Sequence, residues 1–231
     1  VLPFLEILFS VTSPMRLLEL SNPNNPLLRR LSLEAPGTYH HSIVVGNLAE
    51  TAAEAVGADP LLTRVGALYH DVGKLARPYF FVENQRGGEN PHDKMTPNLS
   101  RMVILNHVKE GIELAKEYKL PDVIIDFIAE HHGTSMVQYF YQKAVKTEQN
   151  PVLAEDFRYP GPKPRSKETA ILMLADSSEA AVRSLTNPTF DKVQGMIKNI
   201  IKAKLDNGQL SDCNLTLKEL DIIAEVMSKV A

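Results

Sequence analysis

The chain has 231 residues, of which 44% are hydrophobic and 23% charged, a composition typical of a globular protein with one sizeable core. The formal net charge of −3 excludes the strong positive field that non-specific binders of polymeric nucleic acid use. A single cysteine, Cys213, excludes an internal disulfide and is typical of a reducing, cytosolic protein.

The chain begins with an apolar stretch that Pro3, Glu6 and Ser10 interrupt. This stretch is shorter than the ~20 apolar residues that a membrane-spanning helix requires, and it lacks the basic start of a secretory signal. The first residue is valine rather than methionine, so we expect the sequence to be a piece of a longer protein.

Apolar residues then recur at steps of three and four along nearly the whole chain, which predicts one all-α domain over residues 1–231. The predicted helices cover 3–10, 14–20, 25–32, 38–56, 60–71, 97–118, 121–132, 135–147, 167–184, 189–205 and 216–230. Two long loops rich in proline and glycine, 77–97 and 148–166, interrupt them. The basic residues of the second loop fit either a solvated linker or a phosphate-binding role.

Several histidines lie on the apolar faces of these helices. His41 shares a stripe with Val45 and Leu48, which directs it into the core, and His107 and His131 lie on similar stripes. The adjacent pairs His70-Asp71 and His131-His132 fall at predicted helix ends, where neighbouring side chains can converge.

Asp176 lies on the buried side of an apolar helix, with no lysine or arginine within one turn on its stripe. A buried, unpaired carboxylate is costly, and a metal ion would compensate its charge. Imidazole nitrogens combined with carboxylate oxygens suit Mn²⁺, Fe, Zn²⁺ or Co²⁺, and the single cysteine excludes a thiolate site.

This set of residues resembles the HD-domain superfamily of metal-dependent phosphohydrolases, whose fold is all-α. The resemblance rests on the HDxGK segment His70-Asp71-Val72-Gly73-Lys74, together with the upstream His41, the downstream His107, His131 and His132, and the distal Asp176. Three further stretches are similar to the cytosolic HD domain of the seven-transmembrane HD (PgpH-type) cyclic di-AMP phosphodiesterases: 77–81, 90–93 and 159–164. The resemblance covers essentially the whole chain.

The resemblance implies two divalent transition-metal ions, most simply Mn or Fe. It assigns His41, His70, Asp71 and Asp176 to one ion, and Asp71, His107, His131 and His132 to the other. The implied reaction is hydrolysis of cyclic di-AMP to linear pApA by attack of a metal-activated hydroxide on phosphorus, with Asp71 and Lys74 as catalytic residues. For Lys74, a simple pairing with the dipole of a helix end is the alternative.

The resemblance further implies a cytoplasmic domain of an integral membrane protein, with residues 1–20 as a juxtamembrane helical lead-in. Substrate binding is expected at Lys74, Tyr79, Lys163 and Arg165, the last two facing the second phosphate of the dinucleotide. Two alternatives stay open: a phosphohydrolase for another cyclic dinucleotide or nucleotide, and a non-catalytic nucleotide sensor with structural metals. The Gly-Tyr-Pro motif of cyclic di-GMP-degrading relatives is absent after His132.

Overall fold

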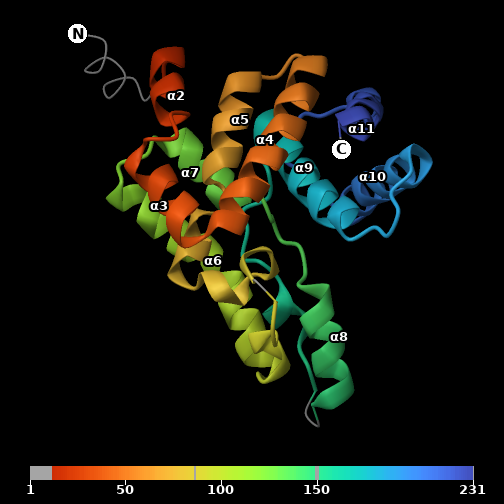
Figure 1. Cartoon of the computed structure of the whole chain (residues 1–231). Coiled ribbons are helices and arrows are strands. Elements are labelled where there is room, and N and C mark those ends of the chain that lie inside the picture. The colour runs from red at the N-terminus through yellow and green to blue at the C-terminus, as the bar shows by residue number, and fades with distance from the viewer. Residues whose placement is uncertain (1–11, 86, 149–150, 231) are drawn as a thin grey trace.

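The computed structural model of the chain describes residues 12–85, 87–148 and 151–230. Within these ranges it holds ten α-helices and no β-strand, which confirms the all-α prediction. In chain order the helices are α2 (Pro14–Leu20), α3 (Pro26–Glu34), α4 (Pro36–Ala55), α5 (Pro60–Tyr69), α6 (Pro97–Glu117), α7 (Asp122–Glu130), α8 (Gln138–Thr147), α9 (Lys167–Arg183), α10 (Phe190–Asp206) and α11 (Leu217–Val230) (Figure 1).

All predicted helices from 14–20 onward are confirmed, with ends that differ by at most three residues from the expected ones. The predicted helix 3–10 lies outside the described residues. None of the helices within the described ranges combines the length and the hydropathy needed to cross a lipid bilayer.

Proline begins five of the helices, a position at which its missing N–H costs nothing. The side chains of Ser13, Asn25, Asp59 and Thr96 cap α2, α3, α5 and α6 by accepting hydrogen bonds from backbone N–H groups of the first turn. These local signals explain why the sequence predicted the helix starts well.

Helix α4 is central, since it packs against α3, α5, α9 and α11 (Figure 1). One apolar cluster joins α4, α9, α10 and α11 and contains Leu48, Leu172 and Ile223, all nearly inaccessible to solvent. A second cluster joins α2, α3, α5 and α7 and contains Leu20 and Tyr69, whose hydroxyl donates to the carbonyl of Leu20. Helix α2 therefore packs against the second apolar cluster through Leu17 and Leu20.

Glycine allows a close approach between the turn after α5 and helix α6. A Cβ atom added at Gly73 would lie 1.8 Å from the carbonyl oxygen of His107, and one added at Gly111 would lie 2.8 Å from Ile128. The glycine of the HDxGK segment thus lets α6 carry His107 up to Asp71.

The described parts of the two long loops contain short elements that the sequence did not predict. The first contains the short 3-10 helices η2 (Pro78–Phe80), η3 (Val82–Asn84) and η4 (Pro91–Asp93), and the Asn84 side chain accepts a hydrogen bond from Thr38 N of α4. The second contains η5 (Ala154–Phe157) and an isolated antiparallel bridge between Met136 and Arg158. The described part of the first loop is thereby linked to α4, and that of the second loop to the segment that follows His132.

The contact between α5 and α7 gives a test of this packing. A Cβ atom at Gly66 would lie 2.4 Å from the buried ring of Phe127. We expect Gly66→Ala to lower the free energy of unfolding by about 1–3 kcal/mol, because the ring has to shift within a packed core.

The matched control is Gly195→Ala on the exposed face of α10, where a Cβ atom would meet nothing within 4 Å. This change should raise stability by about 0.5–1 kcal/mol, since alanine restricts the unfolded chain. Urea unfolding of both variants measures the two effects, and equal stabilities would contradict the close α5–α7 contact.

Candidate metal centre

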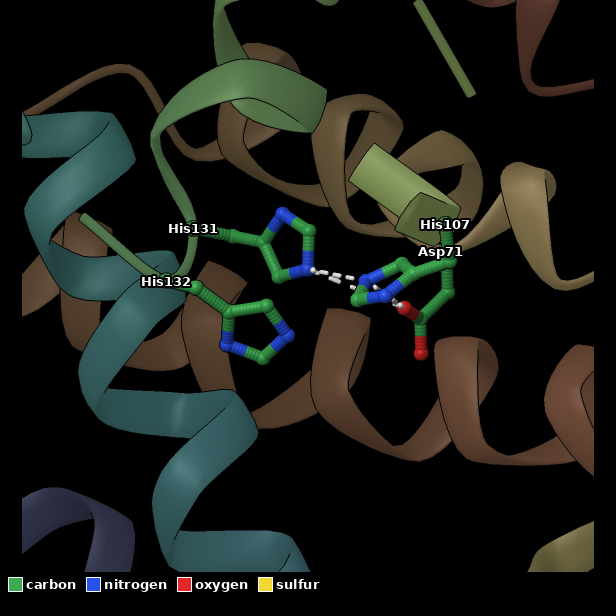
Figure 2. Close-up of side chains that lie close together, drawn as sticks. All are labelled: Asp71, His107, His131 and His132. Carbon is green, nitrogen blue, oxygen red and sulfur yellow. Dashed lines mark hydrogen bonds and ion pairs between the residues drawn. The ribbon is translucent and has the colours of Figure 1, made fainter. Parts of the chain in front are cut away.

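The seven predicted ligands lie in helices α4, α6 and α9 or directly after helices α5 and α7, and they meet in two groups. The first group is Asp71, His107, His131 and His132, and the second is His41, His70 and Asp176; within each group, one ligand atom per residue lies within 4.8 Å of the others. Figure 2 shows the first group with its side chains directed at one another. The structure therefore brings together the seven residues that the sequence analysis singled out.

Helix ends bring the adjacent pairs into the centre. Helix α5 ends at Tyr69, so His70 is its C-cap and Asp71 precedes the 3-10 helix η1 (Val72–Ala76). Helix α7 ends at Glu130, and His131 is its C-cap. Both helices end two residues before their predicted ends, and this early end lets consecutive side chains point to one place instead of diverging by ~100°.

Asp71 lies between the two groups, with one oxygen toward each. Its Oδ1 is 3.4 Å from His107 Nε2 and 3.7 Å from His131 Nε2. Its Oδ2 is 3.3 Å from His70 Nε2 and 3.7 Å from His41 Nε2. This arrangement is the one that a carboxylate bridging two cations requires.

The backbone orients three of the histidines. The Nδ1 atoms of His70, His107 and His131 lie 2.7, 2.6 and 2.8 Å from the carbonyl oxygens three residues earlier, at Ala67, Ile104 and Ile128. A carbonyl only accepts, so each Nδ1 carries the proton and each Nε2 faces the centre. Metal-binding histidines are oriented in this way by a second partner.

Two observations test whether these residues fit a metal. His107 Nε2 and His131 Nε2 are 3.3 Å apart, and burial lowers the pKa of both rings, that of His131 to about 3. Two unprotonated nitrogens at this distance repel unless a cation lies between them. In addition, His70 Nε2 and Asp71 Oδ1 are buried without a hydrogen-bond partner. The residues fit a divalent metal well.

His41 is held by side chains instead of the backbone. Its Nδ1 is 2.6 Å from Glu179 Oε2, and its Nε2 is 3.0 Å from Asp176 Oδ1. Burial lowers the pKa of His41, but its bonds to these two carboxylates outweigh burial and raise it. Glu179 also pairs with Arg183, at 3.3 Å.

The buried carboxylate of Asp71 is stabilised by positive charge around it. Burial opposes ionisation of Asp71, yet Lys74 and His70 outweigh it and hold the pKa of the carboxyl well below its usual range. Burial likewise lowers the pKa of His70, but the charges of Asp71 and Asp176 raise it to about 10. A proton on His70 therefore provides, in the metal-free protein, part of the charge that a cation would provide.

Lys74 is bound between two carboxylates. Its Nζ lies 2.6 Å from Asp71 Oδ2 and 2.8 Å from Glu83 Oε1, and it stands over the ring of Phe81. The predicted alternative, a lysine paired only with a helix dipole, does not describe these contacts. The ammonium holds Asp71 in place at the edge of the metal centre.

The other expected substrate-binding residues have their contacts elsewhere. Tyr79 is 52% exposed, and its hydroxyl donates to Glu89 O. Lys163 Nζ donates to Ser211 Oγ at 3.3 Å, and Arg165 pairs with both Glu130 and Asp126. The structure therefore does not bring these three into contact with the metal-ligand set.

Sequence reasoning missed three residues that support the centre. Glu179 carried a signal, because it lies three residues after Asp176 on the same helix face. Glu83 carried none, since its contact with Lys74 depends on how a loop folds. Tyr159 stacks on His132 with ring centroids 4.1 Å apart.

His92 lies in the first long loop and is 5% exposed, with Nε2 bonded to the carbonyl of Phe80. The ring packs against Phe80 and Phe140, and this contact with α8 is what covers it. His92 lies outside the two groups of ligand-type residues.

Comparison with known proteins identifies relatives of this chain. The HD domain family matches residues 38–181. The chain is 53% identical over 226 residues to the cyclic-di-AMP phosphodiesterase PgpH of Bacillus subtilis, and 50% identical over 228 residues to that of Listeria monocytogenes. Each alignment covers 98% of this chain but 32% of the relative, so the chain spans about a third of their length.

Among solved structures, the chain is similar to the HD domain of L. monocytogenes PgpH in complex with cyclic-di-AMP. The TM-score is 0.87 at 50% identity, and the match covers 90% of this chain and 97% of that one. The family match, the all-helical fold and the two His/Asp groups agree with one another. The chain belongs to the HD domain family.

Proposed function

We propose that this domain is a dinuclear metal-dependent phosphodiesterase that hydrolyses cyclic di-AMP to linear pApA. The observation that carries the proposal is the position of Asp71, each of whose oxygens faces one of two groups of ligand-type residues. The substrate follows from similarity, since the relatives are named cyclic-di-AMP phosphodiesterases and a related HD domain binds this dinucleotide.

One ion is assigned to His41, His70, Asp71 and Asp176, and the other to Asp71, His107, His131 and His132. The nitrogen and oxygen donors suit Mn, Fe, Zn or Co among divalent metals, and the family resemblance favours Mn or Fe. When bound, two such ions supply a water of lowered pKa and polarise the phosphate. Water then adds to phosphorus, the bond from phosphorus to the 3′ oxygen breaks, and the products are a 5′-phosphate and a 3′-hydroxyl.

The residues of this chain orient the reactants. Lys74 holds Asp71 and lies 13% exposed, close enough to the centre to contact a phosphate oxygen as negative charge develops there. Roles for Tyr79, Lys163 and Arg165 in substrate binding stay predictions. A cytoplasmic location and an attachment to a membrane-embedded part of a longer protein also stay predictions of the family resemblance.

The first test counts the metals. Protein purified without chelator and supplied with Mn²⁺ or Fe²⁺ should contain two ions per chain by elemental analysis. His41→Ala should retain about one, because only one of the two groups loses a ligand. His40→Ala is the matched control, since this neighbouring histidine is exposed and should keep both ions. One ion or none in the wild type would contradict the dinuclear proposal.

The second test separates ligation from catalysis. Asp71→Ala removes the bridging carboxylate and should lose metal and activity together. Lys74→Met should keep both metals and lower kcat by roughly ten- to a thousandfold, the scale of one lost electrostatic contact. Steady-state kinetics and metal analysis of the same preparations measure both effects.

Glu83→Gln distinguishes the two roles that Lys74 has in this proposal. It leaves the lysine present but removes one of its two carboxylate partners. If Lys74 contacts phosphate, Glu83→Gln should reduce kcat much less than Lys74→Met. Equal losses would instead assign Lys74 to holding the loop, and a wild-type kcat in Lys74→Met would remove it from catalysis.

The third test follows the product. Ring opening creates a terminal phosphate and a freer backbone, so pApA should leave before a second cut. We expect pApA to accumulate in a chromatographic time course, with AMP as a slow secondary product and cyclic di-GMP as a poorer substrate. AMP without a pApA intermediate would contradict the assignment, and stoichiometric binding without turnover would indicate a sensor.

A further inference from the structure

Most cations near the metal centre are already neutralised. Lys74 contacts Asp71 and Glu83, and Arg165 contacts Glu130 and Asp126. In the loop 148–166, Arg158 pairs with Glu155, whereas Lys163 donates to the hydroxyl of Ser211. Lys167, the first residue of α9, pairs with Glu219 of α11. For the phosphate that is not hydrolysed, an ammonium or guanidinium that has to leave a carboxylate first contributes little to binding.

Lys204 on α10 differs from the ion-paired cations, and its hydroxyl partner, unlike that of Lys163, lies in the turn directly after His132. Its Nζ donates to Ser135 Oγ at 2.9 Å, and no ion pair to a carboxylate is formed by this lysine within the described part of the chain. Burial lowers its pKa, and the charge of Asp176 opposes this only in part. Lys204 is therefore a partly buried ammonium that has a hydroxyl but no compensating anion at hand.

The turn that holds Ser135 adjoins the metal centre. Ser135 N donates to His132 O at 3.0 Å, and Ser135 O accepts from the N–H of Tyr159, whose ring stacks on His132. Gln209, in the turn after α10, accepts from the N–H of Thr134 and so ties the same turn to the end of α10. Lys204 and Ser135 thus form a fixed pair directly beside His132.

Exposure shows which side of the centre a ligand reaches. The side chains of His132 and Asp176 are 22% and 12% exposed, whereas those of His41, His70 and His131 are 3% or less. The open edge therefore lies at His132 and Asp176. This is the edge beside which the Lys204–Ser135 pair is placed.

We propose that Lys204 and Ser135 bind the second phosphate of the cyclic dinucleotide, the one that is not hydrolysed. This inference rests on the proposed function and adds a subsite to it. A cyclic dinucleotide carries two phosphodiesters on one compact ring, so one can lie at the metals while the other lies at the open edge. An ammonium and a hydroxyl both donate hydrogen bonds to phosphate oxygens, and the phosphate supplies the anion that Lys204 lacks.

The test compares two substrates in the metal-loaded protein. Lys204→Met should raise KM for cyclic di-AMP at least tenfold with kcat within about threefold of wild type, because a binding contact made equally in ground and transition states is lost. For bis(p-nitrophenyl) phosphate, which has one phosphate, the loss in kcat/KM should be at least tenfold smaller. Ser135→Ala should show the same pattern more weakly.

Three further variants complete the design. Lys204→Arg should recover most of the affinity, since it restores the charge. Lys202→Met is the matched control, because Lys202 is an exposed lysine two residues away on α10, and it should match wild type. Lys163→Met tests the lysine that the sequence analysis expected to face the second phosphate. Thermal unfolding and metal content of each variant verify that fold and centre are intact.

The outcomes separate the two proposals. A wild-type protein that does not hydrolyse cyclic di-AMP overturns the proposed function, and the subsite with it. If the wild type is active and Lys204→Met has an unchanged KM, only the subsite is overturned. Equal losses on both substrates, or a raised KM in Lys163→Met instead of Lys204→Met, also overturn the subsite.

Discussion

The structure depends on one buried carboxylate. Asp71 is 2% exposed, and a carboxylate in such a position is stable only if positive charge and hydrogen-bond donors surround it. Helices α4, α5, α6, α7 and α9 each bring at least one polar group to this carboxylate or to its neighbours, and Lys74 adds a full charge. The two apolar clusters pack against these helices. They hold the imidazoles and carboxylates close enough to interact electrostatically.

Helix termination is the means by which few residues form so dense a centre. At His70-Asp71 and His131-His132 the regular helix ends, so neighbouring side chains turn toward one point. Gly73 then allows the backbone of α6 to approach the turn at a distance that excludes any Cβ atom. Loop 77–97 completes the enclosure by returning Glu83 to Lys74.

Local signals in the sequence predicted much of this arrangement. Helices followed from the spacing of apolar residues and from proline at helix starts, and the inward direction of His41, His107 and Asp176 followed from their phase on those helices. Contacts made by loops could not be predicted in this way. Glu83 reaches Lys74 only because η3 docks on α4, and His92 is buried only because α8 covers it. Such contacts depend on packing between distant segments, for which the sequence holds no periodic signal.

The two kinds of histidine anchor have different consequences for evolution. His70, His107 and His131 are oriented by backbone carbonyls, which every residue type supplies, so no single substitution at the anchoring position abolishes the partner. His41 is oriented by the side chain of Glu179, which one nucleotide change can alter. Mutation of a partner that orients a metal-binding histidine typically lowers metal affinity or activity by ~10–100-fold. The orientation of His70, His107 and His131 is therefore robust to mutation of the anchoring residue, whereas the orientation of His41 can be adjusted by substitution of Glu179.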